Sequence, residues 1–452
     1  MIKLRFLSAG AVAMSMVPTL IGAADAVPSW TSPNQCRRLD NQKVYDMSGP
    51  VKLFEPIDWT FSNPSYSVNP YDVVATATFT HAAEDNIVTQ LYYDGGDNWK
   101  LRFTGTAVGQ WSFSTSSTDS DLNGLTGSVM VTDNPGVPGF TTKYAGGNRW
   151  GRTGVNQAYV PQFAMYSTPY HYYNNPGLVD QGIETFFGDH GFNGLHTGVA
   201  CRWFDINQTD YDGIPSMDPN PDPRTFEALE LLIGKVHAAG GVVHIWQWGD
   251  EQRHQTPVKW GINRAVDRRL QRYICARLGP LPGWSMGYGF DLQEWVTADD
   301  LEVWHNYMQA HLGWSHYLGA RSPDMTQIYD GLDYSSYQQW RPTYDTYVQG
   351  IEQLHPGKPT FFEDRFRVRE NVYPEKDYDL DMTRRGLWHS TMAGGAANIW
   401  GYMIDPPADG SSGVYPNKHE LLTYSRFFRM MSAIGSDRFT KDMVRDLSLI
   451  HI

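Results

Sequence analysis

The feature that most restricts the fold of this chain is a change in its hydrophobic pattern near residue 140. From about residue 158 to 433, short apolar stretches alternate with segments whose apolar residues recur every three to four positions. The first pattern predicts buried strands and the second predicts amphipathic helices. About eight strands and seven clear helices alternate, which is typical of parallel βα units.

Eight such units predict an α/β fold, a (β/α)8 TIM barrel over residues 145–435, ahead of an open doubly wound sheet. No G-x-G-x-x-G or P-loop follows a predicted strand, which weakens the nucleotide-binding alternative. Asp222 and Thr297 are expected helix N-caps, and Asp300 completes a capping signal. Strands are expected at 158–165, 194–199, 241–248, 284–290, 318–321, 331–337, 358–362 and 397–403. Helices are expected at 179–190, 223–239, 263–278, 297–318, 343–354, 382–392 and 419–433.

The region before the barrel has strand-like alternation instead. Residues 73–79, 91–93, 99–103, 110–113 and 128–131 alternate between apolar and polar, and Gly-, Asp- and Ser-rich turns separate them. Short strands at this spacing predict a β-sandwich domain, which we place at residues 36–135. The Pro- and Gly-rich stretch 133–139 is the expected linker.

The two ends of the chain lie outside these domains. Lys3 and Arg5 precede an apolar stretch that ends in Ala24-Asp25-Ala26, so residues 1–26 are interpreted as a signal peptide and the protein as secreted, extracellular or periplasmic. A membrane anchor is the alternative, although Pro18 and Gly22 shorten the apolar run. Residues 436–452 are expected to be a C-terminal tail, at which the sequence could be truncated.

Composition excludes several classes of protein. Aromatic residues make up 14% of the chain and charged residues 19%, which excludes intrinsic disorder, coiled coil and collagen. The net charge of −13 argues against nucleic acid or an anionic membrane as the main partner. The three cysteines allow one disulfide at most, and no Cys/His spacing indicates zinc. We therefore expect no metal and no cofactor.

Two glutamates end predicted strands of the barrel. Glu294 follows the fourth strand and Glu363 follows the seventh. Active sites of TIM barrels lie at the carboxyl ends of the strands, so both carboxylates are expected in one cleft. Such a pair is the apparatus of glycoside hydrolysis, in which one group protonates the leaving oxygen and the other attacks the anomeric carbon. The alternative is that each glutamate is a solvated loop residue.

At these positions the sequence resembles the clan A retaining glycoside hydrolases, and within them the apiosidase-like group that carries an N-terminal β-sandwich. The resemblance is carried by residues 98–103 (NWKLRF), 109–113 (GQWSF), 358–366 (KPTFFEDRF), 384–388 (RRGLW) and 393–396 (AGGA). It implies that Glu294 is the acid/base and Glu363 the nucleophile. Gln293 stands where many members have an asparagine that binds the sugar 2-hydroxyl, which leaves the identity of the reacting sugar open.

Other strand ends carry residues suited to sugars. Flat indole rings fit the C–H faces of pyranoses, although packing in the barrel core explains at least half of the tryptophans equally well. Tyr337 could orient the nucleophile, and Asp291 or Asp333 could support the catalytic pair. The predicted substrate-binding residues are Trp248, Trp295, Trp400, Gln293, Tyr337, His244, Arg253 and Arg365.

Arginines gather at the same predicted edge of the barrel. Arg202 follows the second strand, Arg253 the third and Arg365 the seventh. Guanidinium groups suit carboxylate or sulfate oxygens, so the substrate could be a uronate-containing or sulfated polysaccharide. Local salt bridges, for instance to Asp250 or Asp364, are the competing explanation.

Three functions remain open from the sequence. The first is a secreted retaining glycoside hydrolase that cleaves a plant or algal cell-wall polysaccharide or oligosaccharide. The second is a non-catalytic carbohydrate-binding protein, against which the presence of both Glu294 and Glu363 argues. The third is a polysaccharide lyase, in which Arg365, Tyr337 and His244 would act on a uronate.

Overall fold

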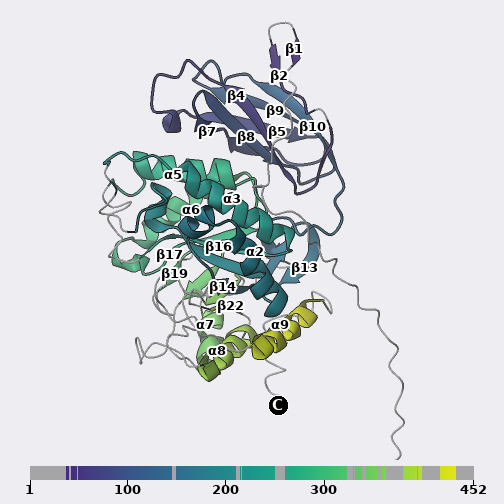
Figure 1. The fold of residues 1–452 in the computed structure, drawn as a ribbon, viewed down its shortest axis with the longest axis vertical. Helices are drawn as coiled ribbons and strands as arrows, with labels where there is room; N and C mark the ends of the chain where they lie inside the picture. Colours follow the sequence, from purple (N-terminus) through teal and green to yellow (C-terminus); the bar gives the residue numbers. More distant parts are fainter. Residues whose placement is uncertain are drawn as a thin grey trace, which may run out of the picture.

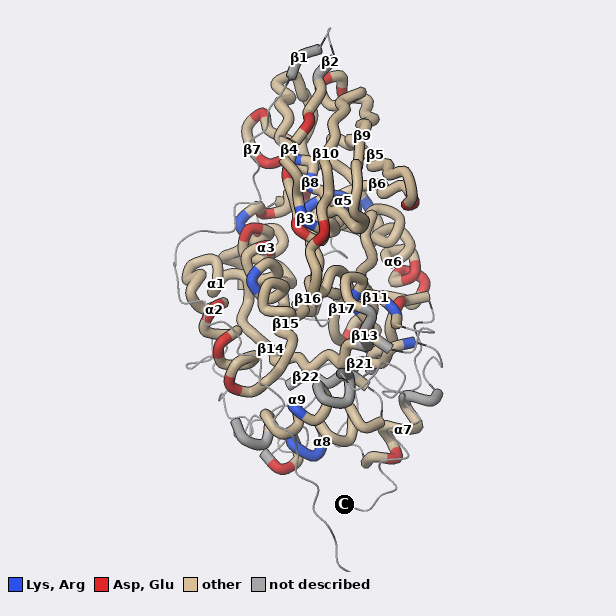
Figure 2. Tube along the Cα trace, turned by 90° about the vertical axis from the view of Figure 1, so that its right-hand side faces the viewer, with Lys and Arg blue, Asp and Glu red and all other residues tan. Residues whose placement is uncertain are grey.

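The computed structural model describes residues 37–39, 42–47, 49–144, 149–209, 214, 216–249, 260–322, 329, 331–337, 343–353, 358–362, 380–393, 395–399 and 418–433. Antiparallel sheets form one end of the molecule, and a parallel sheet surrounded by helices forms the other (Figure 1 and Figure 2). The predicted signal peptide and C-terminal tail lie outside the described residues.

The parallel sheet curls until its two ends meet. Its strand order is β18-β17-β16-β15-β14-β22-β21-β20-β19, and every neighbouring pair is parallel. The two end strands are separated by one residue, Ala320, so they belong to a single chain segment. The strands are β14 (Gln162–Met165), β15 (Gly194–Gly198), β16 (Val242–Trp248), β17 (Trp284–Gly289), β18 (Leu318–Gly319), β19 (Arg321–Ser322), β20 (Ser335–Tyr337), β21 (Thr360–Phe362) and β22 (Gly395–Ile399).

Helices connect successive strands and cover the outside of this sheet (Figure 1). In α3, for example, Phe226, Leu229, Ile233 and Val236 form a buried stripe at helical spacing, which packs in the same core as Val243 of β16. The helices are α1 (Pro169–Asn174), α2 (Gly177–Ile183), α3 (Pro223–Ala238), α5 (Ala265–Leu278), α6 (Ala298–Leu312), α7 (Tyr344–Gln353), α8 (Leu380–Met392) and α9 (Lys418–Ala433).

Several expected boundaries were wrong, and the strand expected at 331–337 begins only at Ser335. The strand expected at 158–165 is two strands, because Pro161 separates β13 from β14. The helix expected at 179–190 is α2 followed by a wider turn at Glu184–Asp189. The helix expected at 297–318 ends at Leu312, since Gly313 adopts a left-handed conformation (φ 75°). The N-caps at Asp222 and Thr297 are confirmed.

Two further sheets share one core in the N-terminal region. Trp59 of β4 lies 5.9 Å from Phe79 of β5 and 4.9 Å from Phe113 of β9, measured between ring centroids, so the two sheets pack face to face. The larger sheet contains β1 (Arg37–Leu39), β2 (Gln42–Val44), β10 (Thr126–Thr132), β9 (Gly109–Ser117), β5 (Ala75–His81) and β6 (Ile87–Gln90), with β3 (Val51–Lys52) paired to β10. The smaller contains β4 (Pro56–Ser62), β8 (Asn98–Thr104) and β7 (Tyr92–Gly95).

A third antiparallel sheet packs against the amino-terminal part of the curled sheet. It consists of β11 (Thr141–Tyr144), β12 (Arg149–Arg152) and β13 (Val155–Tyr159). The ring of Trp150 lies 4.7 Å from that of Tyr317 and 5.3 Å from that of Tyr334. Because these contacts fill the sheet interior at one end, the opposite, carboxyl end is where a ligand could enter.

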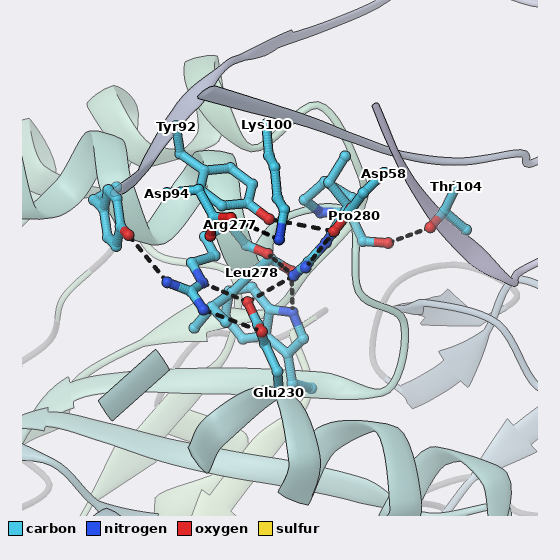
Figure 3. A network of polar contacts seen from close by, with 12 residues as sticks. Asp58, Tyr92, Asp94, Lys100, Thr104, Glu230, Arg277, Leu278 and Pro280 are labelled. Atoms are coloured by element: carbon cyan, nitrogen blue, oxygen red, sulfur yellow. Dashed lines mark hydrogen bonds and ion pairs between the residues drawn. The ribbon is translucent and has the colours of Figure 1, made fainter. Parts of the chain in front are cut away.

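A buried ionic network joins the antiparallel sheets to the helices (Figure 3). Arg102 of β8 donates to both carboxylate oxygens of Asp58, at 2.8 and 2.9 Å, and to Glu230 of α3 at 2.7 Å. Arg277 of α5 donates to the same glutamate at 2.5 Å. Burial alone would raise the pKa of Glu230, but the two guanidinium groups outweigh it and hold that pKa at about 2.

Candidate functional site

All strands of the curled sheet are parallel, so their carboxyl ends lie along one edge. We call this edge the carboxyl rim and define it by Gly198, Trp248, residues 291–294 and residues 321–322. The chain after β17 forms a short 3-10 turn, Leu292–Glu294, directly at the rim. The fourth strand therefore delivers Glu294 to the expected edge of the sheet.

Glu294 is exposed, although the turn that carries it is firmly held. Asp291 adopts the left-handed conformation (φ 54°), which reverses the chain, and its carbonyl accepts a hydrogen bond from the Glu294 amide at 3.2 Å. Leu292 is fully buried in the main core. The arrangement presents a carboxylate to solvent from a backbone that is fixed on both sides.

Arg321 of β19 is the charged residue that the sequence analysis missed at this rim. Its side chain is fully buried and donates to the Asp291 carboxylate. Its guanidinium carbon lies 5.9 Å from the ring centroid of Trp246 and 5.4 Å from that of Phe290. The signal in the sequence was an arginine inside a short apolar strand, where a cation needs a buried partner.

His244 lies deeper inside the sheet and is fully buried. Its Nδ1 is 2.9 Å from the Ser285 hydroxyl, and its Nε2 is 3.4 Å from the Tyr334 hydroxyl. Its ring also lies 4.9 Å from that of Phe361. Since neighbouring side chains surround the imidazole, these contacts favour a packing and hydrogen-bonding role in the sheet interior, and the contact of His244 with substrate stays a prediction.

The two described tryptophans of the predicted site also pack against protein. Trp248 is 1% exposed and lies among core side chains. Trp295 is half-buried, with its ring 6.2 Å from Trp304 of α6 and its indole N–H donating to the Gly249 carbonyl at 3.2 Å. These contacts favour the packing alternative over a sugar platform. Asp333 likewise accepts from Gln309 at 2.6 Å and supports β18 rather than the rim.

Gln293 belongs to the carboxyl rim, and the backbone of Tyr337 lies beside it. The side-chain oxygen of Gln293 is buried and has no hydrogen-bond partner within the described part of the chain. Such an acceptor is costly to leave unpaired, so it is suited to receive a hydroxyl donor. Tyr337 ends β20, and its backbone lies opposite Ser322 in the parallel register, next to Arg321.

Four predicted site residues lie outside the described residues. Glu363 follows the last residue of β21, and Trp400 follows the last residue of β22. Arg253 and Arg365 belong to segments that are likewise not described. Their predicted roles stay predictions.

Arg202 lies at the rim, in the 3-10 turn Ala200–Trp203 that follows β15. Ala200 starts this turn with a left-handed backbone (φ 55°), which is uncommon for a residue other than glycine. Arg202 is half-buried, and within the described residues its side chain forms no ion pair and its Nε has no partner. Burial and this arginine both lower the pKa of the nearby His171.

The described residues show no group of three or more His, Cys, Asp or Glu side chains able to hold a metal ion. In the same part of the chain, no helix combines the length and the apolar character needed to cross a bilayer.

Known proteins resemble this chain in two ways. Residues 50–118 match the profile of a family described only as a domain of unknown function, DUF5060, and no curated protein matches. A structure from Bacteroides vulgatus, provisionally described as a glycoside hydrolase, is similar with a TM-score of 0.68 and 17% identity, over 85% of this chain and 79% of that one. A family 5 glycoside hydrolase from the same organism has a TM-score of 0.47 and 15% identity, over 66% of this chain and 74% of that one. The structural neighbours are thus described as glycoside hydrolases, and the likeness to the first shows that this chain shares the fold of that structure.

Proposed function

We propose that the protein is a retaining glycoside hydrolase of clan A, related to the apiosidase-like group. In this proposal the curled sheet is a (β/α)8 barrel, and the paired antiparallel sheets are an N-terminal β-sandwich. The observation that carries it is Glu294, an exposed carboxylate on a fixed turn at the carboxyl end of β17. Support also comes from Glu363, the residue that follows β21 in the sequence, and from the likeness to the Bacteroides fold.

The mechanism then has two steps. The Glu363 carboxylate attacks the anomeric carbon, and the glycosidic C–O bond breaks while Glu294 gives its proton to the leaving oxygen. Water next attacks the anomeric carbon from the side that the leaving group vacated, opposite Glu363; Glu294 takes the proton of the water, and the bond to Glu363 breaks. Both groups return to their starting states, and the product keeps the configuration of the substrate.

The proposed substrate is a plant or algal cell-wall polysaccharide that carries carboxylate or sulfate groups. Arg202 supports this class, since it is a half-buried guanidinium at the rim without an ion-pair partner in the described residues. Guanidinium groups bind such anions with two parallel hydrogen bonds. Arg253 and Arg365 are proposed to contribute further positive charge. Secretion is proposed from the pattern of residues 1–26.

Product analysis on neutral, uronate-containing and sulfated glycans tests the function. We expect Glu363→Ala to abolish turnover while glycan binding persists, and an NMR time course on wild-type protein to show retained configuration. Glu302→Ala, an exposed glutamate of α6, is the matched control and should remain active. An inverted product would replace the nucleophile by a water-activating base, and undiminished activity of Glu363→Ala would refute the assignment. Binding without products in wild-type protein would favour the non-catalytic alternative, and an unsaturated product absorbing in the ultraviolet would favour the lyase.

The substrate class has its own test. Arg202→Ala should weaken binding of a uronate-containing glycan far more than that of the matched neutral glycan. Equal losses on both glycans would mean that this arginine is structural.

A further inference from the structure

The ion pair at the carboxyl rim connects the fifth strand to the turn after the fourth. Arg321 belongs to β19, Asp291 precedes the turn Leu292–Glu294, and β19 is in contact with that turn. We propose that Arg321 is a positioning residue, which holds Glu294 in place through Asp291. This inference rests on the proposed role of Glu294 as the acid/base.

Asp291 links Arg321 to Glu294, because its carboxylate and its backbone carbonyl have different partners. Its carboxylate accepts from Arg321, and its backbone carbonyl accepts from the Glu294 amide at 3.2 Å. Its left-handed backbone leaves little freedom between these two contacts. A movement of the Asp291 side chain therefore moves the peptide that carries Glu294.

The opposite side of the turn is held by other elements. Leu292 is buried in the core, and its carbonyl accepts from the Val296 amide at 2.7 Å. The Trp295 indole reaches the Gly249 carbonyl beyond β16. Arg321 supplies the attachment from the side of the fifth strand, so its loss releases one side of the turn and leaves the other intact.

Arg321 is itself immobile. Its side chain is 0% exposed, and its guanidinium carbon lies 5.9 Å from the ring centroid of Trp246 and 5.4 Å from that of Phe290. A planar guanidinium can contact an aromatic ring while donating in its own plane to a carboxylate, and a lysine ammonium cannot reproduce that geometry. The chain thus has a buried cation behind the exposed carboxylate that would do the chemistry.

Loss of this support should impair proton donation selectively. A misplacement of about 1 Å can cost about 100-fold in rate. A poor leaving group needs protonation by Glu294, whereas an activated aryl group leaves with little help. A positioning defect is therefore distinguishable from general damage by its dependence on the leaving group.

The experiment compares kcat/KM for the 2,4-dinitrophenyl, 4-nitrophenyl and phenyl glycosides of a sugar that wild-type protein hydrolyses. The variants are Arg321→Met, which removes the cation, Asp291→Asn, which keeps an acceptor in a residue that tolerates the left-handed backbone, and Glu294→Ala. We expect Arg321→Met to lose about 100-fold on the phenyl glycoside and less than about fivefold on the dinitrophenyl glycoside. Asp291→Asn should show a smaller loss of the same kind, and Glu294→Ala a larger one.

Arg102→Met is the matched control, because it removes an equally buried arginine at the interface with α3, away from the rim. It should lower stability without changing the dependence on the leaving group. Equal losses of Arg321→Met on all three glycosides, with Glu294→Ala still selective, would overturn this inference alone. If wild-type protein hydrolyses no glycoside, or Glu294→Ala shows no selectivity, the proposed function itself fails and this inference fails with it.

Discussion

Two buried arginines serve different parts of this molecule. Arg102 lies between the antiparallel sheets and the helices, where the side chains of its carboxylate partners Asp58 and Glu230 are 2% and 7% exposed. Arg321 lies at the carboxyl rim and pairs with Asp291, whose side chain is 31% exposed. The first network is closed to water, and the second opens toward the site where a substrate would bind.

The difference indicates what each pair contributes. In the closed network, the hydrogen bonds of the guanidinium group run to carboxylates and to the carbonyl of Arg277, so removing one member leaves buried charges uncompensated. At the rim, a carboxylate that loses its partner can be rehydrated. We infer that the interface pair mainly stabilises the fold, whereas the rim pair mainly sets geometry.

The largest expected effect is that of Arg102→Ala. The variant leaves the buried Asp58 carboxylate without its cation and leaves Glu230 paired to Arg277 alone, and we expect the free energy of unfolding to fall by about 3–5 kcal/mol in urea denaturation. Lys100 lies on the same strand as Arg102, and Lys100→Ala breaks its partly exposed ion pair with Asp94 of β7 (2.7 Å), which should cost less than about 1 kcal/mol. Similar losses for both variants would show that water reaches the network and would remove the contrast with the rim.

The stabilisation by the interface network should be lost in acid and be complete at neutral pH. The folded protein holds the pKa of Glu230 at about 2, against an ordinary value of 4.5, so the stabilisation is complete above pH 4.5 and is lost as the pH falls toward 2. We expect urea midpoints to drop across this window. Glu230→Gln should be less stable at neutral pH and show a flatter dependence below pH 4.5. An unchanged slope in that variant would assign acid sensitivity to other groups.

Arg321→Met should cost less stability than Arg102→Ala. The methionine side chain can keep apolar contacts with Trp246 and Phe290, and Asp291 is partly exposed already. We expect a loss of about 1 kcal/mol in the free energy of unfolding, near the median for single substitutions. A loss of about 4 kcal/mol would mean that the rim pair stabilises the fold as strongly as the interface pair does.

The sequence predicted the alternation of strands and helices well because periodicity reports burial directly. Every helix expected between 179 and 433 has a counterpart, and the weak strand near 318–321 is the segment where the sheet ends meet. The sequence did not predict β11 and β12, because these strands depend on pairing with each other rather than on an alternation of apolar and polar residues. Helix ends also depended on single residues such as Gly313.

The site was predictable in position and less so in detail. Glu294 was expected at the end of the fourth strand, and the structure places it there. His244 and Trp248 were expected to contact substrate, but a residue at a strand end can face the interior or a helix, and the sequence does not distinguish these cases. Arg321 was missed because its importance comes from Asp291 and Trp246, which lie far from it in the sequence.

The smallest expected effect on leaving-group dependence is that of Thr297→Ala. This variant tests whether any destabilisation near Glu294 changes that dependence as the loss of Arg321 would. Thr297 lies three residues after Glu294 and caps α6, where its hydroxyl accepts from the Asp300 amide at 3.2 Å. Thr297→Ala removes this cap and should lower the free energy of unfolding by about 1 kcal/mol in thermal or urea unfolding. The turn at the rim would keep its contacts to Arg321 and to the core, so the dependence of kcat/KM on the leaving group should equal that of wild-type protein. If Thr297→Ala became selective against the phenyl glycoside, local destabilisation would suffice to misplace the acid, and the role of Arg321 would no longer be specific.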